Sequence, residues 1–138
     1  TTGNFAKMKG KLNWPVQGKI TGKFGKTRNP DTGVVTENVG IDILGKSGMQ
    51  VKSVLDGVVS TITYIRGHGN IIIIDHGGGF STVYAHVDKI IVGENEYIQM
   101  GNSIASVAIP DHGSSGRLHF EVWGNQKKLN PEKWLTSR

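Results

Sequence analysis

The chain has 138 residues, with 16 basic and 11 acidic side chains and a formal net charge of +5. This length allows one domain with a hydrophobic core and excludes two. The absence of cysteine excludes disulfides and thiolate chemistry. No apolar run approaches the ~18–20 residues of a membrane-spanning helix, so no transmembrane segment is expected. The basic residues are scattered and do not alternate with aromatic residues in a stripe, so nucleic acid is not an expected partner.

The beginning of the chain lacks the apolar stretch of a signal peptide. We expect residues 1–12 to be a linker or tail, residues 13–135 to form one domain, and residues 136–138 to be a C-terminal tail. The segment 25–38 contains Pro30 and Gly33 and is expected to be a long exposed loop or a loose hairpin.

Short strands account for most of the domain, because no window sustains a helical apolar period and 20 glycines punctuate the chain. The run 70–75, which contains "NIIII", does not alternate and predicts a strand covered on both faces. Residues 77–79 are three glycines that predict a hairpin turn, and "NPEKWL" near the C-terminus predicts one turn of helix. The predicted fold class is an all-β antiparallel sandwich with little helix. The predicted strands are 51–55, 58–65, 70–75, 81–86, 97–100, 104–108 and 118–123.

Three short motifs carry most of the chemical information: "NVGID" (38–42), "YAHV" (84–87) and "RLHFEV" (117–122). With the flanking stretches "WPVQGKITGKFG" and "GNIIIIDHGGGFSTVYAH", they resemble the LytM-type domain of the M23 zinc peptidases, which cut peptidoglycan cross-bridges. The resemblance covers about residues 13–135. It implies the LytM fold, in which a lipoyl/biotinyl type of half-motif is duplicated.

The resemblance implies a zinc site that this sequence has partly lost. A catalytic zinc needs three protein ligands and an open position. By the family pattern, Asp42 and His119 stand in ligand positions and His86 stands in an acid/base position. Asn38 stands where the first zinc ligand is expected, and Arg117 stands where the first histidine of H-x-H is expected.

Both replacements oppose zinc catalysis. An asparagine amide is a neutral oxygen donor that binds Zn²⁺ much less well than imidazole does. Arg117 is permanently protonated and cannot act as a base. At ~4 Å and an effective dielectric of ~20, two unit charges repel by ~4 kcal/mol, and a divalent ion roughly doubles this. We therefore expect no intact catalytic residue, no bound metal and no cofactor, with Asp42 and His119 as vestigial ligand positions and His86 as a vestigial catalytic residue.

Within the superfamily, the EnvC-like and NlpD-like LytM factors share this kind of defect, and the arrangement "FG…NPxTG…NxGIDI" resembles the EnvC-like group in particular. The resemblance implies a non-catalytic domain in the periplasm or cell envelope that binds and activates a cell-wall N-acetylmuramoyl-L-alanine amidase, with peptidoglycan as a further candidate partner. It also implies a coiled coil upstream in the full-length members. The candidate partner-binding residues of the former substrate groove are Asn38, Asp42, His86, Arg117 and His119.

Two other functions stay open at this stage. One is a zinc endopeptidase that uses Asn38, Asp42 and His119 as an atypical ligand set. The other is a peptidoglycan-binding module without activity. Individual residues also have ordinary structural interpretations. Asp42 could be a strand-end aspartate and His86 a structural histidine, His76 is expected to be structural at a hairpin mouth, and His68 and His112 are expected to be loop residues.

Overall fold

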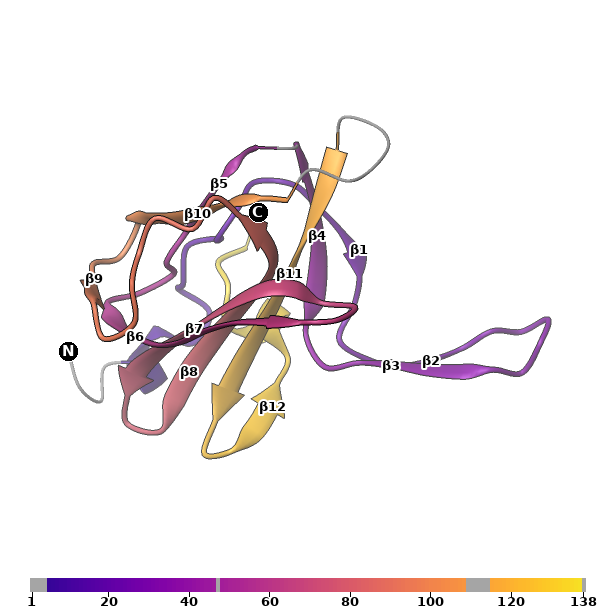
Figure 1. The fold of residues 1–138 in the computed structure, drawn as a ribbon. Coiled ribbons are helices and arrows are strands. Elements are labelled where there is room, and N and C mark those ends of the chain that lie inside the picture. The colour runs from indigo at the N-terminus through magenta and orange to yellow at the C-terminus, as the bar shows by residue number, and fades with distance from the viewer. Residues whose placement is uncertain (1–4, 47, 109–114, 138) are drawn as a thin grey trace.

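The computed structural model describes residues 5–46, 48–108 and 115–137, and these form an antiparallel β structure (Figure 1). Its main sheet has ten strands in the order β1-β4-β11-β8-β7-β6-β9, with β10 pairing with both β5 and β8, and β12 pairing with β11. A separate two-stranded sheet contains β2 and β3. The strands are β1 (Lys19–Gly22), β2 (Gly25–Arg28), β3 (Val35–Asn38), β4 (Ile41–Lys46), β5 (Gln50–Lys52), β6 (Gly57–Ile65), β7 (Gly69–Gly77), β8 (Phe80–Asp88), β9 (Tyr97–Ile98), β10 (Ser103–Val107), β11 (Ser115–Gly124) and β12 (Lys127–Leu129).

The predicted all-β antiparallel class is confirmed. The helical content of the described residues is limited to two short 3-10 turns, Phe5–Met8 and Pro131–Lys133. The second turn is the predicted "NPEKWL" helical turn, and the side chain of Asn130 caps it by accepting a hydrogen bond from the backbone N–H of Glu132. No helix in the described ranges is both long and apolar enough to cross a membrane.

The core lies on one face of β4, β8 and β11, and the opposite face carries the polar residues of the site. Ile43 pairs with Leu118, and Phe120 pairs with Tyr84, all with fully buried side chains. Because neighbouring residues on a strand point to opposite faces, the residues between them point outward. Asp42 and His119 are such residues, and they are directly paired across β4 and β11.

The β7–β8 hairpin turns at three glycines, as predicted, and all three have positive φ: 81° at Gly77, 65° at Gly78 and 86° at Gly79. The isoleucine run in β7 is buried on its core face, where Ile72 and Ile74 are inaccessible. Its outer face is covered only in part, because Ile71 is buried in a second small apolar cluster but Ile73 is half-buried. The lack of alternation in the sequence thus reflects a sheet with an apolar patch on its outer face.

The first residues are not a linker as far as the structure describes them. Phe5 is fully buried and stacks on Phe80, with ring centroids 4.8 Å apart, and it contacts the tilted ring of Trp134, with centroids 5.1 Å apart. Leu12 is also fully buried and forms a parallel bridge with Leu135. The packed unit therefore includes residues from Phe5 onward, which corrects the expected boundary at residue 13. The scattered apolar residues of 5–12 have no recognisable period because only two of them enter the core.

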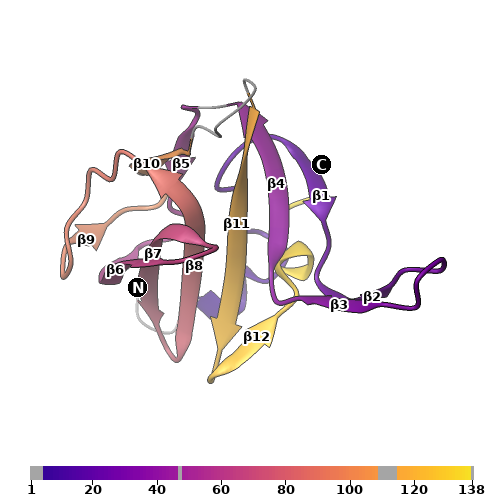
Figure 2. The ribbon, with the colours of Figure 1, turned by 45° about the vertical axis from the view of Figure 1, so that its right-hand side comes forward.

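The segment 25–38 is a regular hairpin, β2–β3, that projects away from the body of the domain (Figure 2). Its turn is held by Asn29, whose side-chain oxygen accepts from the N–H of Asp31 at 2.8 Å and of Thr32 at 3.3 Å. Its side chains are mostly exposed. From the sequence, either a long loop or a loose hairpin was expected for this segment. The two could not be distinguished, because a hairpin with no buried face shows no apolar alternation.

Candidate functional site

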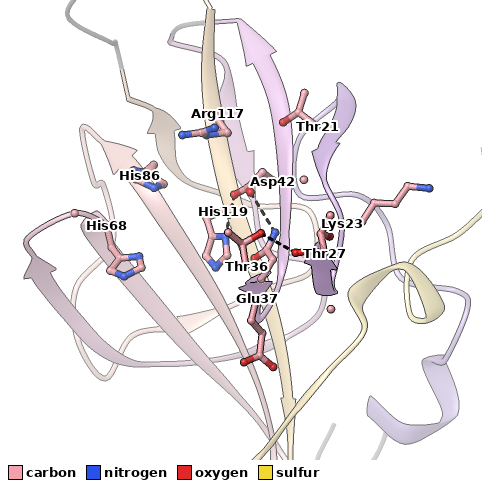
Figure 3. A pocket seen from close by; sticks show the side chains of 14 residues that line it. Thr21, Lys23, Thr27, Thr36, Glu37, Asp42, His68, His86, Arg117 and His119 are labelled. Atoms are coloured by element: carbon pink, nitrogen blue, oxygen red, sulfur yellow. Dashed lines mark hydrogen bonds and ion pairs between the residues drawn. The ribbon is translucent and has the colours of Figure 1, made fainter. Parts of the chain in front are cut away.

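A cavity of about 620 Å³ lies on the outer face of the sheet, between the β2–β3 hairpin and the loop 66–68 (Figure 3). We call it the groove. Its floor comes from β4 and β11, one wall from β1 and the hairpin, and the opposite wall from the 66–68 loop and the end of β8. It contains the five residues singled out in the sequence: Asn38, Asp42, His86, Arg117 and His119.

The floor is built around His119, whose two ring nitrogens both face carboxylates. Nδ1 lies 3.0 Å from Asp42 Oδ1, and Nε2 lies 2.8 Å from Glu121 Oε2. Glu121 is two residues along β11 and therefore on the same face. Its other oxygen, Oε1, accepts from Trp123 Nε1 at 2.7 Å. The result is a continuous chain of hydrogen bonds from Asp42 through His119 and Glu121 to Trp123.

These contacts set the protonation state of the floor. Burial by itself lowers the pKa of His119, but the hydrogen bonds to Asp42 and Glu121 outweigh it and raise the pKa to about 9. Burial raises the pKa of Asp42 and of Glu121, but their hydrogen bonds and charge interactions, chiefly with His119, together outweigh it and lower both. At neutral pH, therefore, His119 is an imidazolium held between two carboxylates.

Asn38 presents its amide nitrogen, not its oxygen, to the floor. Its Nδ2 donates to Asp42 Oδ2 at 3.2 Å, and its Oδ1 accepts from the backbone N–H of Gly40 at 3.2 Å. The backbone N–H can only donate, so this bond fixes which end of the amide faces Asp42. Gly40 is required here by space, because a Cβ on it would lie 2.3 Å from the carbonyl oxygen of Phe120.

Arg117 and His86 stand further along the groove. Arg117 is exposed, and its positive charge helps to lower the pKa of Asp42 and of His86. For His86, burial is the largest cause and the Arg117 charge is the next. His86 has a φ of 64°, a conformation that costs energy for a residue other than glycine, and its N–H donates to the carbonyl of His68 at 2.9 Å.

His68 is a third imidazole of the groove, and the sequence did not place it there. Its ring centroid is 6.4 Å from that of His86 and 6.3 Å from that of His119. It lies on the exposed loop that was expected for it, and this loop lines the side of the groove where His86 also lies (Figure 3). His112 lies outside the described residues.

The wall formed by β1 and the β2–β3 hairpin carries three threonines. In the β2–β3 pair, Thr27 is directly opposite Thr36, and both line the groove with Thr21 of β1. Arg28, next to Thr27 on β2, does not line the groove. This wall was not predicted, because without the hairpin register nothing in the sequence distinguishes Thr27 and Thr36 from loop residues.

Glu121 is the other functional residue that sequence reasoning missed. Its signal was present, because in "RLHFEV" the residues Arg117, His119 and Glu121 alternate with Leu118 and Phe120. A period of two places all three on one face, and a carboxylate on that face is suited to hold the second nitrogen of the histidine.

The donor set does not fit the zinc ion that an M23-like site implies. Asp42 and His119 supply two donors, but the Asn38 oxygen is already used by Gly40, and the proton on His119 Nδ1 would have to leave before a metal could bind there. Glu121 faces the far nitrogen of His119. Within the described part of the chain, no group of three or more His, Cys, Asp or Glu side chains is arranged to hold a metal.

Comparisons with known proteins identify a family and several relatives with similar sequences or structures. The family described as "Peptidase family M23" matches residues 36–131. Murein hydrolase activator NlpD of Escherichia coli (strain K12) is 36% identical over 126 residues, which is 91% of this chain and 31% of that protein. Murein hydrolase activator EnvC of the same strain is 27% identical over 136 residues, 97% of this chain and 31% of that protein.

Among solved structures, a zinc-containing peptidase from Vibrio cholerae superposes with a TM-score of 0.79 at 29% identity. The match covers 94% of this chain and 41% of that one. The chain thus spans about a third of the length of the curated relatives it matches. The similar proteins include both named activators of murein hydrolases and a named peptidase.

Proposed function

The chain belongs to peptidase family M23, and we propose that it is a non-catalytic member whose groove binds a cell-wall amidase and activates it. The observation that carries this proposal is the state of the floor. The groove is open and about 620 Å³ in volume, but its metal-ligand positions are tied to one another. An open cavity that lacks a full set of zinc ligands is suited to binding a partner and not to zinc-dependent hydrolysis.

The names of the relatives support this assignment. NlpD and EnvC are named as murein hydrolase activators, and direct contact with the hydrolase is the simplest way for such a protein to act. We take that enzyme to be an N-acetylmuramoyl-L-alanine amidase. Since murein is the substrate of such an enzyme, the proposed location of this domain is the periplasm or cell envelope.

The charges of the groove indicate how the partner is held. Arg117 on the floor and Lys23 at the hairpin side are cationic, Glu37 on the hairpin is anionic, and Asp42 already faces His119, which it shares with Glu121. Arg117 is therefore available to pair with a carboxylate of the partner, and a guanidinium forms two parallel hydrogen bonds with such a group.

A reconstituted reaction tests this proposal. Purified amidase, this chain and dye-labelled cell-wall sacculi are combined, and the release of soluble dye is measured. We expect release with both proteins together and none with this chain alone. Arg117→Ala should lower activation on the order of tenfold or more, since truncating one partner of an interface charge pair costs about 2–5 kcal/mol. Lys52→Ala, which removes an exposed charge from β5 outside the groove, is the matched control.

The second candidate is a zinc endopeptidase that uses Asn38, Asp42 and His119. The similarity to the peptidase of Vibrio cholerae favours it. Metal analysis separates the two functions. Near-stoichiometric zinc in the purified chain, with cleavage of a stem-peptide or glycine-rich substrate, would overturn the activator proposal. Full activation by the Arg117→Ala protein would show that Arg117 does not pair with the partner.

A further inference from the structure

A second cavity, of about 410 Å³, lies on the same outer face of the sheet as the groove, near the β7–β8 turn. Trp123 is four residues after His119 on β11, so both side chains point to the same face of the sheet. Their partners on β8, Ser81 and Ala85, are likewise four residues apart. The turns of β7–β8 and β11–β12 lie together at one end of the sheet (Figure 2). We call it the Trp123 pocket; its side-chain lining is Ile73, Asp75, Ser81, Val83, Trp123 and Gln126.

Trp123 forms one wall of this pocket and is fixed in place. Its Nε1 donates to Glu121 Oε1 at 2.7 Å, and the Lys128 Nζ lies 5.0 Å from the ring centroid. Lys128 is the cross-strand partner on β12, whereas the pocket lies over β8 and β7 on the other side of β11. The indole therefore stands between them, with one face toward Lys128 and the other toward the pocket.

The floor of the pocket is apolar. Val83 is buried and belongs to the small cluster with Ile71 and Ala85, against which Ile73 and Trp123 pack. Together with the indole, this floor gives a ligand an apolar surface of fixed shape, because β-branched side chains on a sheet have few rotamers.

The rim of the pocket supplies hydrogen-bonding groups that have no partner in the described part of the chain. The Ser81 hydroxyl and the Gln126 amide make no hydrogen bond to another described residue, and Asp75 uses only Oδ1, which accepts from Gly77 N–H at 2.9 Å. A hydroxyl, an amide and a carboxylate oxygen together offer both donors and acceptors. No cationic side chain lines this pocket among the described residues.

We propose that the Trp123 pocket binds a sugar of the murein glycan strand, an N-acetylated amino sugar. The apolar face of a pyranose ring packs against the free face of the indole, and its hydroxyl and acetamide groups meet Asp75, Ser81 and Gln126. The charge of the pocket supports this choice. Its single carboxylate repels the acidic stem peptides of murein but accepts hydrogen bonds from neutral sugar hydroxyls. The site is separate from the groove and would hold the domain on the wall.

Titration with chitotetraose, an oligomer of N-acetylglucosamine, tests the site by calorimetry and by tryptophan fluorescence. We expect a dissociation constant of about a millimolar or below and a change in fluorescence on binding. Trp123→Ala should weaken binding at least about tenfold, because a stacked aromatic contact contributes ~0.5–1.5 kcal/mol beyond its buried area. Trp123→Phe keeps a ring and should restore most of the affinity.

Gln126→Gly provides a variant that does not disturb the fold. Gln126 has a φ of 68°, which glycine adopts without strain, and the side chain is exposed. We expect several-fold weaker binding of chitotetraose and unchanged activation of an amidase. Tyr64→Ala, which removes an exposed aromatic ring elsewhere on the sheet, is the control and should bind normally.

Three results would overturn this inference. They are the absence of chitotetraose binding at tens of millimolar, binding that persists in both Trp123→Ala and Gln126→Gly, and loss of amidase activation in Gln126→Gly. The last result would assign the pocket to a protein partner. None of these outcomes bears on zinc or on Arg117, so the failure of this site is distinguishable from the failure of the proposed function.

Discussion

The two ends of the outer face of β11 differ in what they offer to a ligand. Arg117 and His119 lie in the groove, and Trp123 lies further along the strand, about 20 Å from Arg117 and about 13 Å from His119 at ~3.3 Å per residue. The groove has a charged floor, with threonines on one wall and His68 and His86 on the other. The Trp123 pocket has an apolar floor and a polar rim that carries one carboxylate.

The difference shows that one strand can serve two kinds of recognition because its alternate residues face the same way. Glu121 belongs to both ends, since one of its oxygens faces His119 and the other accepts from Trp123. The groove is the part related to the M23 metal site, whereas none of the expected ligand positions lies in the Trp123 pocket. The comparison therefore separates an altered active site from a neighbouring surface on the same scaffold.

The largest expected effect comes from a substitution in the hydrophobic core that supports both the groove and the Trp123 pocket. Phe120 is fully buried between the residues that point to the two sites, and its ring lies 5.4 Å from that of Tyr84. We expect Phe120→Ala to lower the free energy of unfolding by ~3–5 kcal/mol, because it leaves a cavity in a packed core. Urea denaturation measures this change, and Leu44→Ala, at a position that is 41% exposed, should cost less than ~1 kcal/mol. A loss confined to one of the two binding activities would show that the two ends do not depend on a common core.

The next effect changes the groove alone. Asn38→His combined with Arg117→His replaces the two residues that oppose zinc, so an imidazole at position 38 joins Asp42 and His119 as the third ligand. We expect zinc affinity to rise at least about a hundredfold, since even partners outside the ligand shell contribute about 10–100-fold. Competition with a fluorescent chelator measures it.

Adding Asp42→Asn to that double variant is the control, and it should abolish the gain in zinc affinity. Chitotetraose binding should stay the same in all three proteins, because none of these changes touches the Trp123 pocket. If the unmodified chain binds zinc as tightly as the double variant does, the interpretation of the groove as a lost metal site is wrong.

A smaller effect acts at the residue that joins the two ends. Glu121→Gln keeps the shape of the side chain but removes its charge and one of its two acceptor oxygens, so it can accept from His119 Nε2 or from Trp123 Nε1 but not from both. We expect the free energy of unfolding to fall by about 1.5–3 kcal/mol, the range for hydrogen bonds to charged groups. Chitotetraose binding should weaken as well, because the indole is less firmly held. Glu132→Gln, an exposed carboxylate in the C-terminal turn, is the control. Unchanged stability would mean that the two ends are independent.

The sequence was sufficient for the fold class and for gathering the five groove residues, because motif order and strand alternation are local signals. "RLHFEV" alone determines that Arg117 and His119 share a face opposite to Leu118 and Phe120. That Asp42 lies beside His119 followed from the family resemblance, and the structure supplies the β4–β11 register that produces it.

The remaining features depend on contacts between distant segments, which no local pattern encodes. The threonine wall exists only because Thr27 and Thr36 meet across a hairpin with no buried face. The burial of Phe5 depends on aromatic partners that lie far along the chain, Phe80 and Trp134. The Trp123 pocket was missed for the same reason, since the residues of β7 and β8 that line it with Trp123 come from another part of the sequence.

The last prediction uses pH to test whether the Trp123 end can be weakened separately. His76 lies on the core face of β7, with Nδ1 2.7 Å from the Asp56 carbonyl oxygen and Nε2 2.7 Å from Thr82 Oγ1. Burial lowers its pKa below the ordinary value of 6.5. Below about pH 6.5 the unfolded chain therefore binds more protons at His76 than the folded one does. The contribution of His76 to the free energy of unfolding is thus fully present above that pH and is lost as the pH falls.

Hydrogen exchange between pH 5 and 7 measures the effect along the chain. We expect amides of the β7–β8 hairpin to lose protection as the pH falls, whereas those of β4 keep theirs. Asp42 and Glu121 lose their contribution only at lower pH, since their pKa values lie below the ordinary carboxyl range. His86 titrates in the same direction as His76 because burial and the Arg117 charge lower its pKa, but it lies at the groove end. His76→Gln should remove the pH response of the hairpin only, and a uniform loss of protection across β4 and β8 would show that the sheet opens as one unit.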